Sequence, residues 1–308
     1  ETPSIVVTHV IEKGGGAPDK APLAAREEQA GLRIIGDDNR FIGVNIHMRS
    51  LGHAFFLQKG ADNTYFKNCF AEGEIRKTDD ILEDLESPGS MHYRSDISES
   101  ERERLKERLE PGGEVWPMTE DGFRFYSAGK TTFINCRAEN TRFGFFVSRH
   151  EGPLYLENCV AVGTQGPSFT VGGDDAVMKN CRGDAKYSPL LTTPKGGATL
   201  DLEVYLMPDE LELRQRSRGH IVARLGGATD GKIAILPWKG EEREKKLPIR
   251  VGTWQGGFPA IQNLILKNKT TMPVAIGENA RDLKIYSKGE ILQNDGENID
   301  ILDVPDGD

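Results

Sequence analysis

The sequence predicts an all-β solenoid, a stack of similar coils that are each built from short strands. The dipeptide Asn-Cys recurs at Asn135, Asn158 and Asn180, with spacings of 23 and 22 residues, and a fourth copy stands at Asn68. Asn45 lies 23 residues before Asn68 and continues the same period. A fixed period of this length is typical of stacked repeat architectures. The repeats are rich in Phe, Val, Ile and Thr, and no helical pattern follows each one, which favours strands over helical repeats.

One coil can be followed from Phe143 to Val162. An apolar strand over 143–147 leads through a polar turn to a second strand over 154–156, and a corner at Asn158 leads to a third strand over 159–162. Asn tolerates the left-handed backbone of a tight corner, and its amide can bond to the coils on either side. A single coil cannot bury its apolar face alone, so the core has to come from stacking.

This pattern resembles the right-handed parallel β-helix superfamily, which includes pectate lyases and related polysaccharide lyases and carries an asparagine ladder at one corner. The resemblance covers residues 31–190 and, in part, 258–302. The stretches Gly52–Gln58, Gly73–Asp80 and Asp121–Tyr126 are similar to secreted bacterial β-helix proteins that cleave alginate or other uronates. The resemblance implies one right-handed β-helix domain over residues 1–308, a secreted or periplasmic location, and polysaccharide lyase activity.

Composition narrows the range of functions. The net charge of −9 argues against general nucleic-acid binding, although a locally basic groove could still bind an anionic polysaccharide. No apolar run approaches the roughly 18 residues of a membrane span. The chain starts at Glu1 rather than Met, from which we expect that a secretory signal has been removed. Nothing in the sequence indicates an oligomeric state.

The four cysteines each follow a ladder asparagine, so they occupy one position in successive coils. We expect Cys69, Cys136, Cys159 and Cys181 to form a buried column of small apolar side chains. Disulfides and a metal site are the alternatives. Zinc is disfavoured because no Cys-x-x-Cys pair or histidine cluster accompanies them.

Two stretches depart from the repeat. Residues 74–120 are highly charged, and a capping box at 98–101 predicts a helix that runs to about Leu109 before Pro111-Gly-Gly. We expect this insertion to wall a substrate cleft. Residues 198–256 contain three strand-like runs around Gly226-Gly227, from which we predict an antiparallel hairpin insertion before the coils resume near Ala260.

Strand alternation sorts the first strand of each coil into inward and outward side chains. Phe123 and Phe125 should point inward, which leaves Arg124 and Tyr126 outside. The same rule directs other side chains outward from neighbouring coils, and they form one predicted patch beneath the insertion. Its predicted substrate-binding members on the coils are Arg142, His150, Phe146 and Gln58, and the insertion that roofs the patch adds Arg76, His92 and Arg94.

A basic groove that also holds Tyr and His suits β-elimination of a uronate. The reaction needs a cation beside the carboxylate, a base for the C5 proton and an acid for the leaving oxygen. We predict that Arg124 and Arg149 neutralise the carboxylate. Lys77 or His53 is the predicted base, and Tyr126 the predicted acid.

Three alternatives stay open. A glycoside hydrolase on the same fold would use paired carboxylates, for which Asp79, Asp80, Asp121 and the pair Asp174-Asp175 are candidates. The first three could instead bind Ca²⁺, so the cofactor is either none or Ca²⁺. The third alternative is a non-catalytic carbohydrate-binding module or adhesin, in which Phe146 and Tyr126 stack on sugars.

Overall fold

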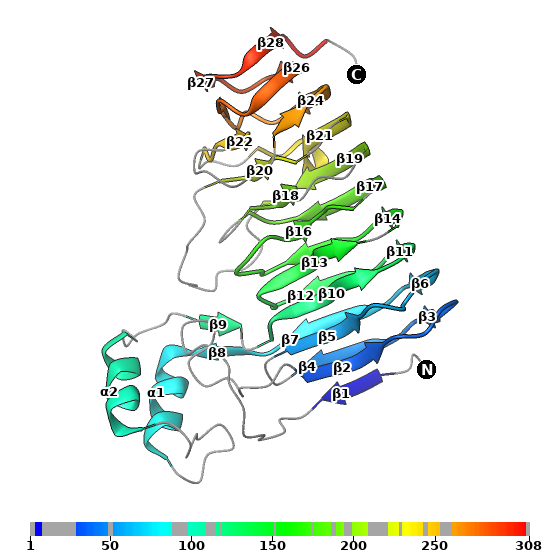
Figure 1. Ribbon diagram of the computed structural model, residues 1–308. Helices are drawn as coiled ribbons and strands as arrows, with labels where there is room; N and C mark the ends of the chain where they lie inside the picture. The colour runs from blue at the N-terminus through cyan, green and yellow to red at the C-terminus, as the bar shows by residue number, and fades with distance from the viewer. Residues whose placement is uncertain are drawn as a thin grey trace.

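The computed structural model is a tall stack of coils with parallel strands, a β-solenoid (Figure 1). The chain starts at one end of the stack and finishes at the other. The structure describes residues 4–7, 29–48, 52–87, 98–108, 115–117, 119–150, 152–173, 175–185, 189–193, 199–208, 221–227, 230–242, 246–252 and 260–305.

One wall of the solenoid is a parallel sheet of ten strands within the described residues. These strands, in their order across the sheet, are β2 (Gln29–Ile34), β5 (Gly52–Leu57), β10 (Asp121–Ala128), β13 (Phe143–His150), β16 (Phe169–Thr170), β18 (Leu191–Thr193), β20 (Ala223–Leu225), β22 (Ile249–Val251), β25 (Val274–Ile276) and β27 (Ile291–Asn294).

The remaining walls form a second parallel sheet, which bends around the asparagine corner and has sixteen strands in the described part. These are β1 (Ser4–Val7), β3 (Arg40–Ile42), β4 (Asn45–Met48), β6 (Thr64–Lys67), β7 (Phe70–Gly73), β11 (Thr131–Ile134), β12 (Arg137–Glu139), β14 (Leu154–Glu157), β15 (Val160–Val162), β17 (Asp175–Gly183), β19 (Thr199–Leu206), β21 (Gly231–Pro237), β23 (Ile261–Gln262), β24 (Leu264–Asn268), β26 (Ala280–Ser287) and β28 (Glu297–Leu302).

The asparagine ladder is confirmed at the corner. Asn68, Asn135, Asn158 and Asn180 all have φ between 49° and 54°, the left-handed region that Asn tolerates. The amides of the last three each donate to the side-chain oxygen of the asparagine one coil before, at 3.2 Å for Asn135, 3.1 Å for Asn158 and 2.6 Å for Asn180. The ladder thus fixes the register of four successive coils.

One apolar core runs through the stack, and in the N-terminal half it contains a column of aromatic rings. Phe55, Phe123 and Phe145 are fully buried and stack with ring centroids 4.7 Å apart. Phe169 continues the stack at 5.3 Å from Phe145. The four cysteines are free and buried beside the ladder, as the structural interpretation of the repeat predicted.

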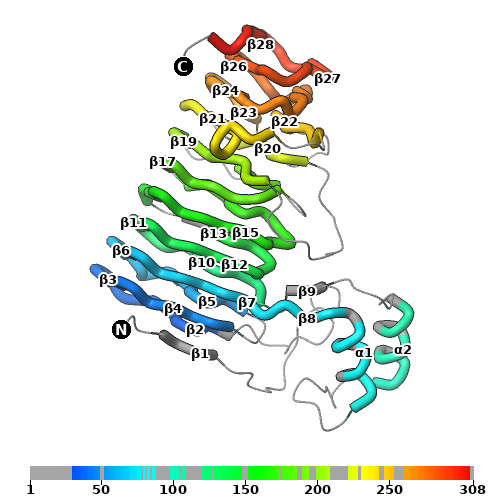
Figure 2. The backbone as a smooth tube through the Cα atoms, turned by 180° about the vertical axis from the view of Figure 1, so that it is seen from behind, coloured from blue at the N-terminus to red at the C-terminus, as the bar shows by residue number. Residues whose placement is uncertain are grey.

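The predicted hairpin insertion over 198–256 is wrong. Strands β19, β20, β21 and β22 pair in parallel with their neighbours and continue the solenoid without a break (Figure 2). The sequence repeat is absent here because β19 is one continuous strand where the earlier coil has two strands, β14 and β15, joined by a corner at Asn158. A register shift between Met178 and Cys181 marks where the corner asparagine drops out.

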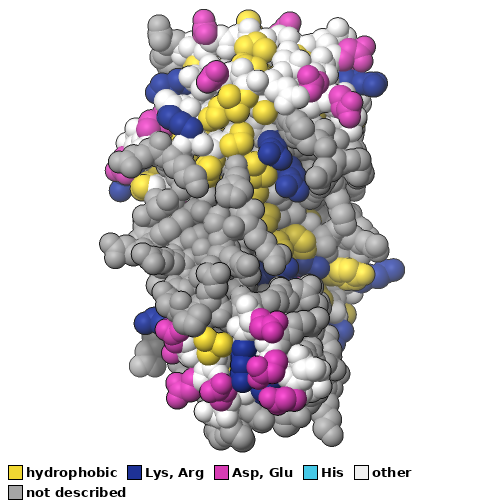
Figure 3. Space-filling model, turned by 90° about the vertical axis from the view of Figure 1, so that its left-hand side faces the viewer, with side chains coloured by type: hydrophobic (Ala, Val, Ile, Leu, Met, Phe, Trp, Pro, Cys, Tyr) yellow, Lys and Arg dark blue, Asp and Glu magenta, His cyan; other side chains and the backbone are white. Residues whose placement is uncertain are grey.

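Residues 74–120 leave the solenoid after β7 and return at β10. They contain β8 (Ile75–Lys77) and β9 (Val115–Pro117), the one antiparallel pair among the described strands, and the helices α1 (Thr78–Glu86) and α2 (Glu99–Arg108). Figures 1 and 2 both show the helices projecting from the side of the stack. Acidic side chains crowd this lower region of the surface in Figure 3. A short 3₁₀ helix, η1 (Trp238–Gly240), follows β21.

Candidate functional site

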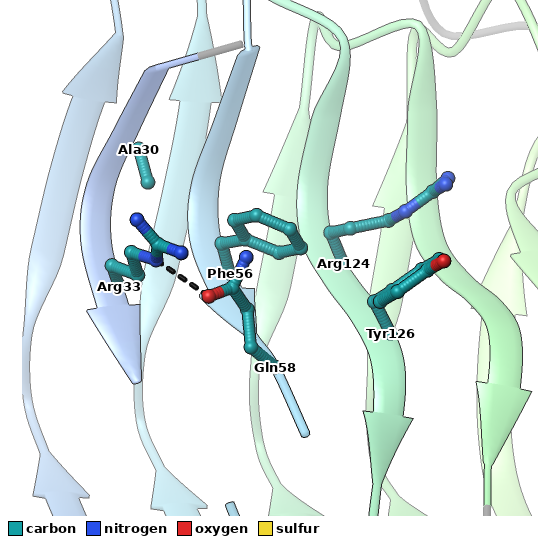
Figure 4. Close-up of a pocket in the computed structure, with 6 residues that line it drawn as sticks. All are labelled: Ala30, Arg33, Phe56, Gln58, Arg124 and Tyr126. Atoms are coloured by element: carbon teal, nitrogen blue, oxygen red, sulfur yellow. Dashed lines mark hydrogen bonds between the residues drawn. The ribbon is translucent and has the colours of Figure 1, made fainter. Parts of the chain in front are cut away.

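The candidate site is a groove of about 570 Å³ on the outward face of β2, β5 and β10 (Figure 4). Its described lining side chains lie on three adjacent strands near the N-terminal end of the ten-stranded sheet, or directly after one of them in the case of Gln58. They are Ala30, Arg33, Phe56, Gln58, Arg124 and Tyr126.

Strand alternation explains why these side chains face outward. Phe55 and Leu57 on β5 are fully buried in the core, so Phe56 between them lies on the opposite face. Phe123 and Phe125 are likewise fully buried, which places Arg124 outside. The inward and outward assignment made from the sequence is confirmed for both strands.

Arg33 and Gln58 form the first polar edge of the groove. The Nε of Arg33 donates a hydrogen bond of 2.5 Å to the Oε1 of Gln58. Arg33 also lies directly opposite Phe56 in the β2–β5 register. The hydrogen bond orients the guanidinium along the groove, beside the ring of Phe56 (Figure 4).

Arg124 is held from two sides. Its guanidinium lies 4.2 Å from the centroid of the Phe146 ring, which belongs to the next strand and faces the same way. Its Nη1 lies 3.5 Å from the Oδ2 of Asp121, a carboxylate with no exposed surface. A guanidinium has five donors in a planar fork, so these contacts position Arg124 and leave donors for an incoming oxyanion.

Tyr126 supplies the phenol of the groove and is 43% exposed. The register between β10 and β13 shifts between Phe125 and Tyr126, so that Tyr126 lies opposite Arg149. Such an irregularity re-aims a side chain at the edge of a sheet. Figure 4 shows Tyr126 and Arg124 on the same face of β10.

His53 is not at the groove surface, and this corrects its predicted role as a base. Its side chain is only 1% exposed, and its Nδ1 lies 2.7 Å from the Oδ2 of Asp121. The ring also packs against Phe56, with centroids 4.6 Å apart. A buried imidazole in contact with a buried carboxylate cannot reach a proton on a polysaccharide, so His53 supports the groove from beneath.

The predicted calcium ligands do not come together. Asp79 and Asp80 are exposed in the first turn of α1, where Asp80 accepts a hydrogen bond of 3.3 Å from the backbone N–H of Lys77. Asp121 is buried under the groove with His53 and Arg124. Over the described residues, no group of three His, Cys, Asp or Glu side chains is arranged to hold a metal ion.

The other predicted members are more scattered. Arg142 directly precedes β13 and is not among the described groove-lining residues. Its guanidinium carbon lies 5.1 Å from the centroid of the Phe143 ring, and its Nη1 lies 3.1 Å from the Oε1 of Glu120. Lys77 is exposed at the end of β8, in the N-cap position of α1, and is not among the described residues that line the groove.

Several predicted residues lie beyond what the structure describes. The backbones of Arg76, Arg149 and His150 are described as strand, but their side chains are not. His92, Arg94 and Asp174 lie outside the described residues altogether. Their predicted contribution to substrate binding stays a prediction.

Sequence reasoning missed Arg33 and the groove-lining role of Phe56. Arg33 stands one repeat period before Phe56, so the period itself contained the signal. The coil that begins at Arg33 has no Asn-Cys corner, so the local sequence does not align Arg33 with Phe56.

The groove therefore combines two arginines, one phenol, one amide and an aromatic ring. None of the six described lining residues carries a carboxylate. The arginines can bind the carboxylate of an acidic sugar, and the ring of that sugar can stack on Phe56. The phenol of Tyr126 can exchange a proton with the bound sugar.

No protein-family model matches this chain, and no curated protein matches its sequence. No helix among the described residues is long and apolar enough to cross a membrane.

Proposed function

We propose that the protein is a polysaccharide lyase that binds an acidic, uronate-containing polysaccharide such as alginate in this groove and cleaves it by β-elimination. The observation that carries the proposal is the placement of Arg33, Arg124 and Tyr126 on one outward face beside Phe56. The resemblance of the asparagine-ladder coils to right-handed β-helix polysaccharide lyases supports the same function, together with a secreted or periplasmic location.

In the proposed reaction, Arg124 pairs with the uronate carboxylate and stabilises the negative charge that develops when C5 loses its proton. The electron pair of the C5–H bond forms a double bond between C4 and C5. The bond from C4 to the glycosidic oxygen breaks, and that oxygen takes up a proton. Substrate and product both carry the carboxylate, but the negative charge on its oxygens increases while C5 loses its proton, so the pairing with Arg124 is strongest in the transition state.

Tyr126 is the proton carrier in this scheme. Since His53 is buried and Lys77 lies outside the groove lining, Tyr126 is the remaining described residue that combines a titratable proton with access to the groove. As a phenolate it accepts the C5 proton, and as a phenol it donates a proton to the leaving oxygen. One group can serve both steps when the proton and the leaving oxygen are on the same face of the sugar.

The test is the rate of unsaturated product formation in two variants. Arg124→Gln should lower kcat/KM about 10²–10³-fold, and Tyr126→Phe about 10²–10⁴-fold. The matched controls are Arg281→Gln and Tyr286→Phe on β26 of the other sheet, which should keep the wild-type rate. Full activity in either groove variant would overturn the assignment.

A non-catalytic carbohydrate-binding module is the second candidate, favoured by the aromatic rings of Phe56 and Phe146 beside the arginines. Binding of an acidic polysaccharide without any product would support it. The hydrolase is less well supported, because a hydrolase needs two carboxylates at its cleft and the described lining has none. A loss of activity in EDTA would indicate that Ca²⁺ assists the reaction.

A further inference from the structure

The groove belongs to a longer row of outward-facing positions that runs across the ten-stranded sheet. Backbone register places eight residues of eight successive strands in this row, each opposite the next. In order they are Arg33, Phe56, Arg124, Phe146, Thr170, Thr192, Arg224 and Arg250.

Two arginines therefore lie next to each other at the far end of the row. Arg224 on β20 is exposed and Arg250 on β22 is half-buried, and the two are register partners. Desolvation lowers the pKa of Arg224, and the neighbouring positive charge of Arg250 lowers it further. The two guanidinium groups concentrate positive charge at one place on the sheet, which favours the binding of a carboxylate there.

The middle of the row separates this arginine pair from the groove. Thr170 and Thr192 are only 3% and 7% exposed, and their hydroxyls hydrogen-bond to each other at 3.0 Å. Arg124 and Arg224 are four strands apart, which corresponds to ~19 Å at ~4.8 Å per strand. Dark-blue Lys and Arg side chains appear beside a stripe of apolar side chains above the insertion in Figure 3.

We propose that Arg224 and Arg250 form a second anion-binding site, which holds a carboxylate of the same acidic polysaccharide chain at a distance from the groove. This inference rests on the proposed function for the identity of the anion. The planar guanidinium fork of each arginine matches the two oxygens of a carboxylate. The threonines between the two sites are covered, so a chain that reaches both must pass beside them.

Two sites on one rigid sheet give the protein a preference for long chains. A polymer that is bound at the groove presents its next segment to Arg224 and Arg250 at a high effective concentration. A trisaccharide is too short to reach both sites and gains nothing from the second one. Long polymers should consequently bind more tightly than the affinity of the groove alone explains.

The experiment compares the affinities of a uronate trisaccharide and a long polyuronate for the full chain. The double variant Arg224→Gln/Arg250→Gln should weaken polymer binding about tenfold or more and leave trisaccharide binding unchanged. The control Arg40→Gln/Arg281→Gln removes two exposed arginines from the other sheet and should leave both affinities at the wild-type value. Thermal unfolding of each variant checks that the fold is kept.

Each outcome bears on one proposal. The second site is overturned if the double variant binds the polymer as tightly as the wild type does. It is also overturned if the control variant loses as much polymer affinity as the double variant. Equal weakening of polymer and trisaccharide also overturns it, because the pair then acts on the groove. If polymer binding depends on the pair while the wild type forms no unsaturated product, the second site stands and the lyase proposal fails. A polymer of sulfated sugars that binds more tightly than the polyuronate would overturn the carboxylate as its ligand.

Discussion

The Nδ1 of His53 lies 2.7 Å from the Oδ2 of Asp121, and the two residues are directly opposite each other on β5 and β10. Both side chains are essentially without exposed surface. Asp121 is also the residue that reaches Arg124 in the groove. A buried polar pair thus lies beneath the proposed catalytic arginine and links it to the strand that carries Phe56.

The first prediction concerns the stability of this pair. His53→Ala should lower the free energy of unfolding by ~3–5 kcal/mol, because it removes the group 2.7 Å from the buried Asp121 carboxylate, which then keeps the longer 3.5 Å contact with Arg124. The natural control is the exposed pair of His47 and Glu72, in which Nδ1 and Oε2 lie 2.5 Å apart and both side chains are more than a third exposed. His47→Ala should cost ~0–1 kcal/mol.

Urea unfolding followed by circular dichroism measures both values. Equal losses in the two variants would contradict the account, since burial is then not what makes the His53 contact important.

Much of the fold could be predicted from the sequence because one residue carries the geometry of each corner. Asn158 and its equivalents specify a left-handed corner, a hydrogen bond to the next coil and the period of the repeat at once. The alternation of Phe and polar residues then fixes which side chains face the core. This is why the orientations of Phe123, Arg124 and Phe125 were predicted correctly.

The strands of the C-terminal half were predicted poorly because their coils lack the asparagine that marks a corner. Strands β19 and β21 cross the corner without a left-handed residue, so no Asn-Cys marks the coil. Short runs of Val, Ile and Leu between glycines then resemble hairpins, although each run pairs in parallel with the coil before it. Parallel pairing is a long-range property that local composition does not encode.

The second prediction separates the two contributions of a ladder asparagine. Asn158 donates to Asn135 at 3.1 Å and accepts from Asn180 at 2.6 Å, and its φ is 54°. Asn158→Gly keeps the backbone conformation and loses both hydrogen bonds, which should cost ~1–3 kcal/mol.

Asn158→Ala also forces a side chain with Cβ into the left-handed region and should cost ~1–2 kcal/mol more than glycine. The comparison is made by thermal or urea unfolding. An alanine variant as stable as the glycine variant would show that the corner backbone adapts and that the ladder acts through its amides alone.

The third prediction concerns the cysteine column. All four cysteines are free and buried, so none should react with a thiol reagent such as Ellman's reagent while the protein is folded. All four should react in denaturant. A thiol that reacts rapidly in the native protein would contradict the packing of the core beside the ladder.

The candidate site was predictable only in part. Arg124, Tyr126 and Gln58 follow from strand alternation, which is local. The burial of His53 depends on Asp121, which is far away in sequence and reaches β5 only after the insertion has left and rejoined the stack. An exposed edge position and a buried one look identical in a single strand.

β-Elimination leaves an unsaturated uronate at the new chain end, and its ultraviolet absorbance distinguishes this reaction from hydrolysis. The wild-type protein is incubated with a panel of acidic polysaccharides, and the ultraviolet absorbance of the unsaturated uronate is followed together with the release of reducing ends. The account predicts that absorbance and reducing ends rise together on at least one uronate polymer. Reducing ends without absorbance would contradict it in favour of hydrolysis, and the absence of both signals would leave the groove as a binding site only.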